Sequence, residues 1–171
     1  MATRTTPLSI QAYGASLRIL AAAAPGRADR LLARRFLTPR RRRTLPPDIP
    51  GVPAERELVR HERESLAVWH WGAGPDVLLA HGWESSAATW AALVPRLVAA
   101  GYRVTAFDMP AHGISTGRRT SVLGMAAAIR TVADTLGPLA AVIGHSAGAT
   151  AAALAAGDGL KAGRCVLLAP R

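Results

Sequence analysis

The stretch IGHSAGA, residues 143 to 149, places a serine between two glycines, each two positions away from it. Ser146 follows an apolar run of strand length and precedes an alanine-rich segment of helix length. A nucleophilic serine needs such a strand-to-helix turn, whose strained backbone lifts the hydroxyl clear of the sheet. Gly144 and Gly148 are explained if strand and helix approach more closely than a Cβ atom permits. The stretch predicts a nucleophile at Ser146; the alternative is an ordinary serine in a glycine-rich loop.

Short apolar runs of strand length lie on both sides of this turn. They are DVLLAHG (76–82), YRVTAFD (102–108), LAAVIGHS (139–146) and RCVLLAP (164–170). The segments between them are long enough for helices, at roughly 86–100, 121–136 and 147–156, and two short alternating strands are expected within 57–71. Buried strands that alternate with helices predict an α/β fold, a mostly parallel sheet with helices on both faces.

The residues after the run at 76–80 are candidates for an oxyanion hole. The carboxyl ends of parallel strands meet at one edge of the sheet, where ligand sites lie. A backbone N–H at Trp83, just after His81 and Gly82, could face a developing oxyanion together with the N–H of Ala147. We expect His81 to fix the loop rather than to act as a catalytic base.

The stretch FDMPAHGIS, residues 107 to 115, follows the next run and is expected to support the site. Asp108 could cap the turn through its side chain, and Gly113 could supply an unusual backbone angle. A metal site built from Asp108, His112 and His81 is the alternative, but these residues have no recognised ligand spacing. We therefore expect neither a metal nor a cofactor.

HGW, FDMPAHGIS and GHSAG, in this order and separation, resemble the N-terminal half of the α/β-hydrolase fold superfamily, in its serine esterase or lipase-like form. The resemblance covers residues 57–170 and implies the strand order 1-2-4-3-5-6. It also implies an acid and a histidine that follow later strands, beyond Arg171, so the fold is expected to be truncated after the sixth strand. Many relatives have glycine where this chain has Ala111.

The resemblance leaves Ser146 without an evident base. His145 should face away from the hydroxyl, because neighbouring residues on a strand point to opposite sides. His112 is the other histidine expected near this edge of the sheet. Without a base in hydrogen-bond reach a serine stays a weak nucleophile, so little activity is expected. The sixth strand, VLLAP, would also form an exposed apolar edge through which the chain could self-associate.

The net charge of +10 is concentrated before residue 64, where 13 arginines face five acids. Apolar residues at helical spacing predict a helix over 10–24, ended by Pro25-Gly26, and a second helix over 28–37. The stretch TPRRRRTLPPDIPGVP, 38–53, has four consecutive arginines and five prolines. It is expected to be a linker. We thus predict a basic helical arm and linker over 1–55 and a partial hydrolase domain over 56–171.

Two roles stay open for this arm. The arginines could be a solvated connector, or residues 10–43 could make weak contact with a membrane surface or a polyanion. No run of 18 or more apolar residues is present and no secretory signal is convincing, so we expect a cytoplasmic protein, with or without peripheral membrane contact. Cys165 is expected to fill core space.

Two functions follow as expectations. The first is a serine hydrolase that acts on a small-molecule ester or related acyl substrate. The second is a catalytically inactive remnant that acts as an interaction protein through its basic arm.

Overall fold

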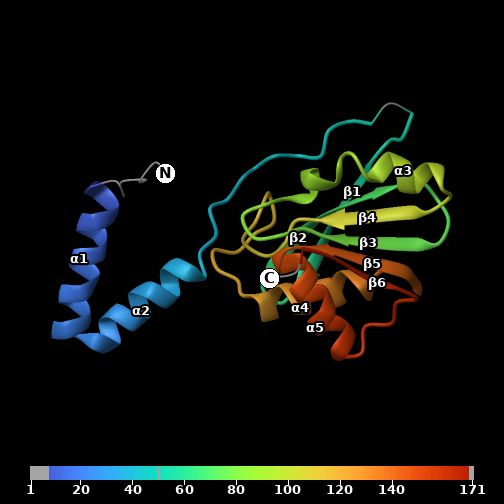
Figure 1. Cartoon of the computed structure of the whole chain (residues 1–171). Helices are drawn as coiled ribbons and strands as arrows, with labels where there is room; N and C mark the ends of the chain where they lie inside the picture. Colours follow the sequence, from blue (N-terminus) through green and yellow to red (C-terminus); the bar gives the residue numbers. More distant parts are fainter. Residues whose placement is uncertain (1–7, 50, 170–171) are drawn as a thin grey trace, which may run out of the picture. The chain divides into compact units, whose positions relative to one another are not determined.

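The computed structural model describes residues 8–49 and 51–169. The chain is divided into two compact units, with the boundary between Leu37 and Thr38 (Figure 1). The first unit holds two helices, α1 (Leu8–Ala23) and α2 (Pro25–Phe36). Pro25 begins α2 instead of only ending α1, so α2 starts three residues before the predicted position. Proline is tolerated there because the first N–H groups of a helix have no intrahelical partner. The domain division near residue 55 stays a prediction.

The second unit contains a six-stranded sheet with the order β1-β2-β4-β3-β5-β6, as the resemblance implied. β1 and β2 form an antiparallel hairpin, β2 pairs antiparallel with β4, and the remaining neighbours are parallel. The strands are β1 (Glu55–His61), β2 (Glu64–Trp71), β3 (Asp76–Ala80), β4 (Arg103–Phe107), β5 (Leu139–His145) and β6 (Cys165–Leu168).

Helices cover both faces of this sheet (Figure 1). The four elements are the 3-10 turn η1 (Ala87–Trp90), α3 (Val94–Ala99), α4 (Val122–Ala133) and α5 (Ala147–Gly157). Side chains of β3 alternate between two cores: Leu78 packs on the side of α4 and α5, and Leu79 packs on the side of η1 and α3. Because both faces are buried, every residue of β3 is apolar or buried, which produces the continuous run seen in the sequence.

The single helix expected over residues 86–100 is divided in two. η1 ends at Trp90 and α3 begins at Val94, with Pro95 in its first turn. Proline has no N–H to donate to the residue four positions earlier, and it disfavours helical geometry in the residue before it. A new helix therefore starts at this point, and the prediction of one continuous helix was wrong.

β6 lies at the edge of the described sheet, with β5 on one side. All four of its residues are exposed, among them Cys165, which was expected in the core. The prediction for Cys165 failed because an apolar run shows that a segment can be buried, but not which strands flank it. Its thiol is accessible in the described structure.

Candidate active site at the carboxyl edge of the sheet

Ser146 lies between β5 and α5 with φ of 53° and ψ of −124°. A non-glycine residue in this region carries strain of about 1–3 kcal/mol, which persists only where the surroundings fix it. The Ser146 N–H donates to the carbonyl oxygen of Leu168 on β6 (2.9 Å), and the Ser146 carbonyl accepts from Ala149 and Thr150 in α5. The side chain makes no capping hydrogen bond to α5, so the hydroxyl is not consumed by the helix it precedes.

Gly144 and Gly148 allow the close approach that the sequence predicted. A Cβ atom on Gly148 would overlap the carbonyl oxygens of Ala80 and His81 at the end of β3. A Cβ atom on Gly144 would overlap the backbone of α5. β5, α5 and the end of β3 therefore pack closely around Ser146, and no side chain fits at either glycine position.

The loop that follows β3 lies directly beside Ser146. A Cβ atom on Gly82 would lie 3.1 Å from the Cβ of Ser146, so the two backbones are in near contact. Trp83 comes next, and its ring meets that of His112 edge to face, with centroids 5.2 Å apart. The structure thus places Gly82 against the serine, with Trp83 next to Gly82 in the same loop and Ala147 next to Ser146 at the start of α5.

His81 is buried and both of its ring nitrogens bind backbone groups. Nδ1 donates to the Gly82 carbonyl (2.7 Å), and Nε2 accepts from the Met109 N–H (3.0 Å). Burial, helped by the nearby His112, lowers the pKa of His81 to about 3. The imidazole is therefore neutral at pH 7 and fixes the loop, which is the arrangement expected from the sequence.

His112 makes the reciprocal connection. Its Nε2 accepts from the Glu84 N–H (3.0 Å) in the loop after β3, and its Nδ1 donates to the Pro110 carbonyl (2.9 Å). Burial lowers the pKa of His112 as well. Each of the two loops thus supplies a histidine that accepts an N–H from the other loop.

Asp108 completes this set of contacts. One carboxylate oxygen accepts from the Ala87 N–H and the other from the Ile114 N–H, each at 2.8 Å. Burial raises the pKa of Asp108, and these two donors oppose the rise. Gly113 has φ of 47°, and a Cβ there would overlap the Asp108 carboxylate. We call His81, His112 and Asp108, with their backbone partners, the cross-loop network.

The cross-loop network also bears on the metal site that the sequence left as an alternative. All four ring nitrogens of His81 and His112 face backbone groups, so neither histidine offers a free ligand atom to a metal. Within residues 8–49 and 51–169, no cluster of three or more histidine, cysteine or acidic side chains could hold a metal ion. Unlike His81 and His112, His145, the residue before Ser146, is exposed at the end of β5.

Ala111 has φ of 64°, in the left-handed region that favours glycine. The residue is buried, and its N–H donates to the Thr116 carbonyl at 2.9 Å. The backbone at this position thus explains why a glycine would suit the turn, and why alanine there carries some strain.

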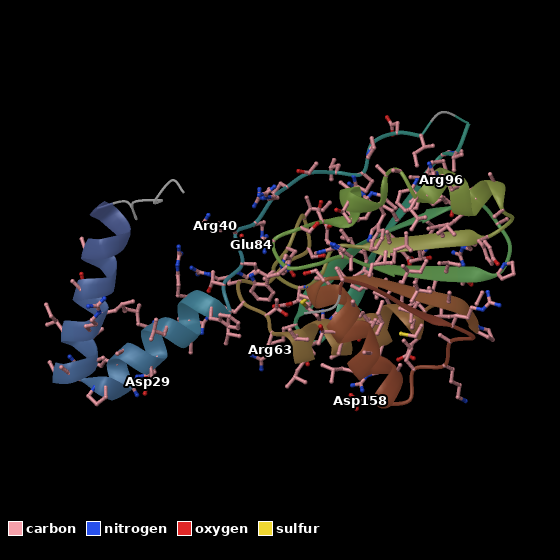
Figure 2. All side chains as sticks on the ribbon, viewed as in Figure 1. Asp29, Arg40, Arg63, Glu84, Arg96 and Asp158 are labelled. Atoms are coloured by element: carbon pink, nitrogen blue, oxygen red, sulfur yellow. The ribbon has the colours of Figure 1, made fainter. Side chains whose placement is uncertain are left out.

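The arginine-rich segment lies against the same loops, which the sequence did not predict. The backbone N–H of Arg40 donates to the Glu84 carboxylate (3.0 Å), and the guanidinium of Arg41 donates to the Gly117 carbonyl. Thr44 accepts a hydrogen bond from the Ser86 hydroxyl. Figure 2 shows Arg40 beside Glu84. Residues 40–44 are therefore attached to the second unit and are not a free linker.

Two hollows in the second unit lie elsewhere. One, of about 570 Å³, lies between the ends of α4 and α5, near the start of β5, and the other borders Gly51 and His70. Neither is lined by Ser146. The candidate site at the carboxyl edge of the sheet is therefore inferred from the backbone geometry and the polar contacts around Ser146, and not from either hollow.

This combination of a strained serine elbow, a loop whose Gly82 lies against it and a 1-2-4-3-5-6 sheet defines the class of protein. The family model for the alpha/beta hydrolase fold matches residues 75–170, and the chain belongs to this family. Its six strands cover only part of the fold.

Particular relatives are similar over shorter spans. A pimeloyl-[acyl-carrier protein] methyl ester esterase of Aeromonas hydrophila subsp. hydrophila is 45% identical over 51 residues, 30% of this chain and 20% of that protein. An epoxide hydrolase of Caballeronia sordidicola is 36% identical over 93 residues, 50% of this chain and 28% of that protein. The chain thus spans less than a third of the length of these curated relatives.

A solved structure agrees with the fold. The thioesterase domain from the curacin biosynthetic pathway superposes with a TM-score of 0.57 at 31% identity, over 61% of this chain and 40% of that one. The similarity thus extends to known members whose names describe ester and thioester chemistry.

Proposed function

We propose that this chain carries the nucleophile of an acyl hydrolase, with Ser146 as the attacking residue and a carboxylic ester or related acyl compound as substrate. The observation that carries the proposal is the Ser146 backbone, with φ of 53° between a strand and a helix. An ordinary loop serine has no reason to hold this strain. The esterase and thioesterase relatives support the choice of an acyl substrate.

The proposed chemistry follows from the surroundings of the serine. The Ser146 oxygen attacks the acyl carbon, and the carbonyl oxygen becomes an oxyanion. The Ala147 N–H lies at the start of α5, where helix geometry provides no intrahelical acceptor, so it can donate to that oxyanion. Trp83, in the loop against Ser146, is the proposed second donor. The alcohol leaves with a proton, and water then hydrolyses the acyl-serine.

The serine proton requires a base, and the two buried histidines near the site are occupied. His81 and His112 hold backbone groups with both ring nitrogens. None of the histidines among the described residues is hydrogen-bonded to Ser146. The acid and histidine that the family resemblance implies would follow later strands. The proposal is therefore tested on the reactivity of Ser146 in the 171-residue chain by itself.

Epoxide hydrolysis is the competing activity, since one relative carries that name. A serine oxygen that opens an epoxide forms an ether, which water does not readily cleave. A serine oxygen that attacks an acyl group forms an ester, which water can cleave. The serine at the elbow therefore favours acyl transfer.

A fluorophosphonate probe tests the proposal, because it phosphonylates activated serines. Because no described histidine is hydrogen-bonded to Ser146, we expect slow covalent labelling of the wild-type chain. Ser146→Ala should not be labelled, and Ser16→Ala, at a serine on α1 in the other unit, should be labelled like the wild type. Circular dichroism would verify that each variant folds. If the wild type is labelled no faster than Ser146→Ala, the inactive interaction protein becomes the better description of this chain.

A further inference from the structure

The α1–α2 unit leaves large apolar side chains on its surface. Among its described side chains, Ala28 is the one that is fully buried. On α1, Ile19 is 71% exposed, and on α2, Phe36 is 79% exposed, with Leu31 and Leu32 near 45%. Removal of exposed leucine and phenylalanine side chains from water is favourable, so a surface that covers these residues gains free energy.

Three arginines of α2 lie across its axis from Leu32 and Phe36, although Leu31 lies among the arginines and Asp29 lies on the side of Phe36. Arg27, Arg30 and Arg34 recur at spacings of three and four and share one face. Leu32 and Phe36, four residues apart, lie on the opposite side of the helix. A helix with arginines on its polar face and large apolar residues on the other is typical of segments that lie in a membrane interface.

Charge identifies the kind of partner. Residues 1–37 contain six arginines and a single acid, Asp29, which Figure 2 labels on α2. Residues 38–171 contain 15 basic and ten acidic residues, so the rest of the chain is also positive. A second copy of this chain would therefore be repelled at long range, whereas an anionic surface would attract α2.

We propose that α2 binds the surface of an anionic phospholipid bilayer. Leu32 and Phe36 enter the boundary between headgroups and acyl chains, and the arginines contact lipid phosphates. None of the described helices is long and apolar enough to cross a membrane, so the helix lies on the bilayer. A nucleic acid would attract the arginines but gives the exposed Leu32 and Phe36 nothing to bury them, which is why lipid is the favoured partner.

Sedimentation with vesicles tests this surface. We expect the full chain to bind vesicles of phosphatidylcholine mixed with phosphatidylglycerol, and not vesicles of phosphatidylcholine alone. Arg27→Gln/Arg30→Gln/Arg34→Gln should lower the partition coefficient on the order of a hundredfold, since each arginine near an anionic surface contributes about 1 kcal/mol. Leu32→Ser/Phe36→Ser should lower it at least tenfold, as expected for two lost apolar contacts.

A charge-matched control separates the helix from the overall charge. Arg118→Gln/Arg119→Gln/Arg164→Gln removes three exposed arginines from the hydrolase unit and should leave vesicle binding within twofold of the wild type. Equal losses in both triple variants, or an unchanged affinity in Leu32→Ser/Phe36→Ser, would replace the lipid surface by nonspecific polyanion binding, which duplex DNA as a competitor would then reveal. Absence of binding to anionic vesicles overturns the proposal. Ser146→Ala should bind like the wild type, because lipid binding does not depend on the proposed chemistry.

Discussion

At the scale of single residues, the site depends on two glycines, because a Cβ atom at either position would overlap the backbone. Gly148 allows α5 to start against the last carbonyl groups of β3, and Gly144 allows β5 to pass close to the first turn of α5. Ser146, between them, has a side chain and therefore carries the strain of the turn. The geometry of the serine is thus set by its neighbours, which leave the serine backbone no relaxed alternative.

Gly148→Ala should lower the free energy of unfolding by about 1–3 kcal/mol, because the added methyl group overlaps backbone oxygens that cannot move aside easily. Urea denaturation measures the change. Gly157→Ala is the matched control on the same helix: a Cβ atom there would have no neighbour within 4 Å, and φ is not in the left-handed region. Its effect should stay within about 1 kcal/mol. Similar losses in the two variants would mean that Gly148 is not tightly packed.

At the scale of elements, the cross-loop network joins the loops after β3 and β4. Three backbone N–H groups, those of Met109, Glu84 and Ala87, donate to side chains of the opposite loop. A buried N–H without an acceptor costs about 1–3 kcal/mol, so each contact has to be replaced if the loops move apart. The loop that carries Trp83 is thereby held beside the serine.

The network predicts how stability depends on pH. The pKa of His81 is lowered to about 3 and that of His112 is also lowered, in both cases mainly by burial. The unfolded chain therefore takes up protons near pH 6.5 that the folded chain rejects, and stability falls as pH decreases from there toward 3. Each histidine contributes up to about 1.4 kcal/mol per pH unit. Urea denaturation between pH 7 and pH 5 measures this slope.

Two further measurements identify the histidines responsible. His81→Gln/His112→Gln should reduce the slope, whereas His145→Gln, at an exposed position, should leave it unchanged. If the double variant fails to fold, nitrogen NMR of the wild-type rings at pH 6 gives the same information, since His81 should remain neutral with its proton on Nδ1. A protonated His81 at that pH would contradict the assignment.

At the scale of the whole molecule, β6 forms one edge of the described sheet. Val166, Leu167 and Leu168 are each about 40% exposed, and β6 carries no charge that would oppose pairing with another strand. Leu167→Lys should therefore reduce concentration-dependent self-association, as measured by sedimentation velocity. Leu123→Lys, at an exposed leucine on α4, is the matched control and should have little effect. A wild-type chain that stays monomeric at high concentration would remove the basis for this expectation.

Much of this architecture could be predicted from the sequence. The buried strands appear as continuous apolar runs because both faces of the sheet are covered, and the elbow appears through its paired glycines. The cross-loop contacts could not be predicted, since side-chain directions in loops depend on tertiary packing. The attachment of Arg40 and Arg41 was missed for the same reason: a run of four arginines indicates charge, but not which carbonyl or carboxylate lies within reach.

The hydrogen bond from the Ser146 N–H to Leu168 connects the proposed nucleophile to the outermost strand. Local opening of β6 breaks this bond. The hydrogen bond therefore contributes both to the free energy of opening β6 and to the stability of the strained serine conformer. By thermodynamic reciprocity, a molecule that binds the serine and requires this conformer also protects β6 against opening. The reactivity of the serine and the local unfolding of the outer strand are thus two observables of one equilibrium.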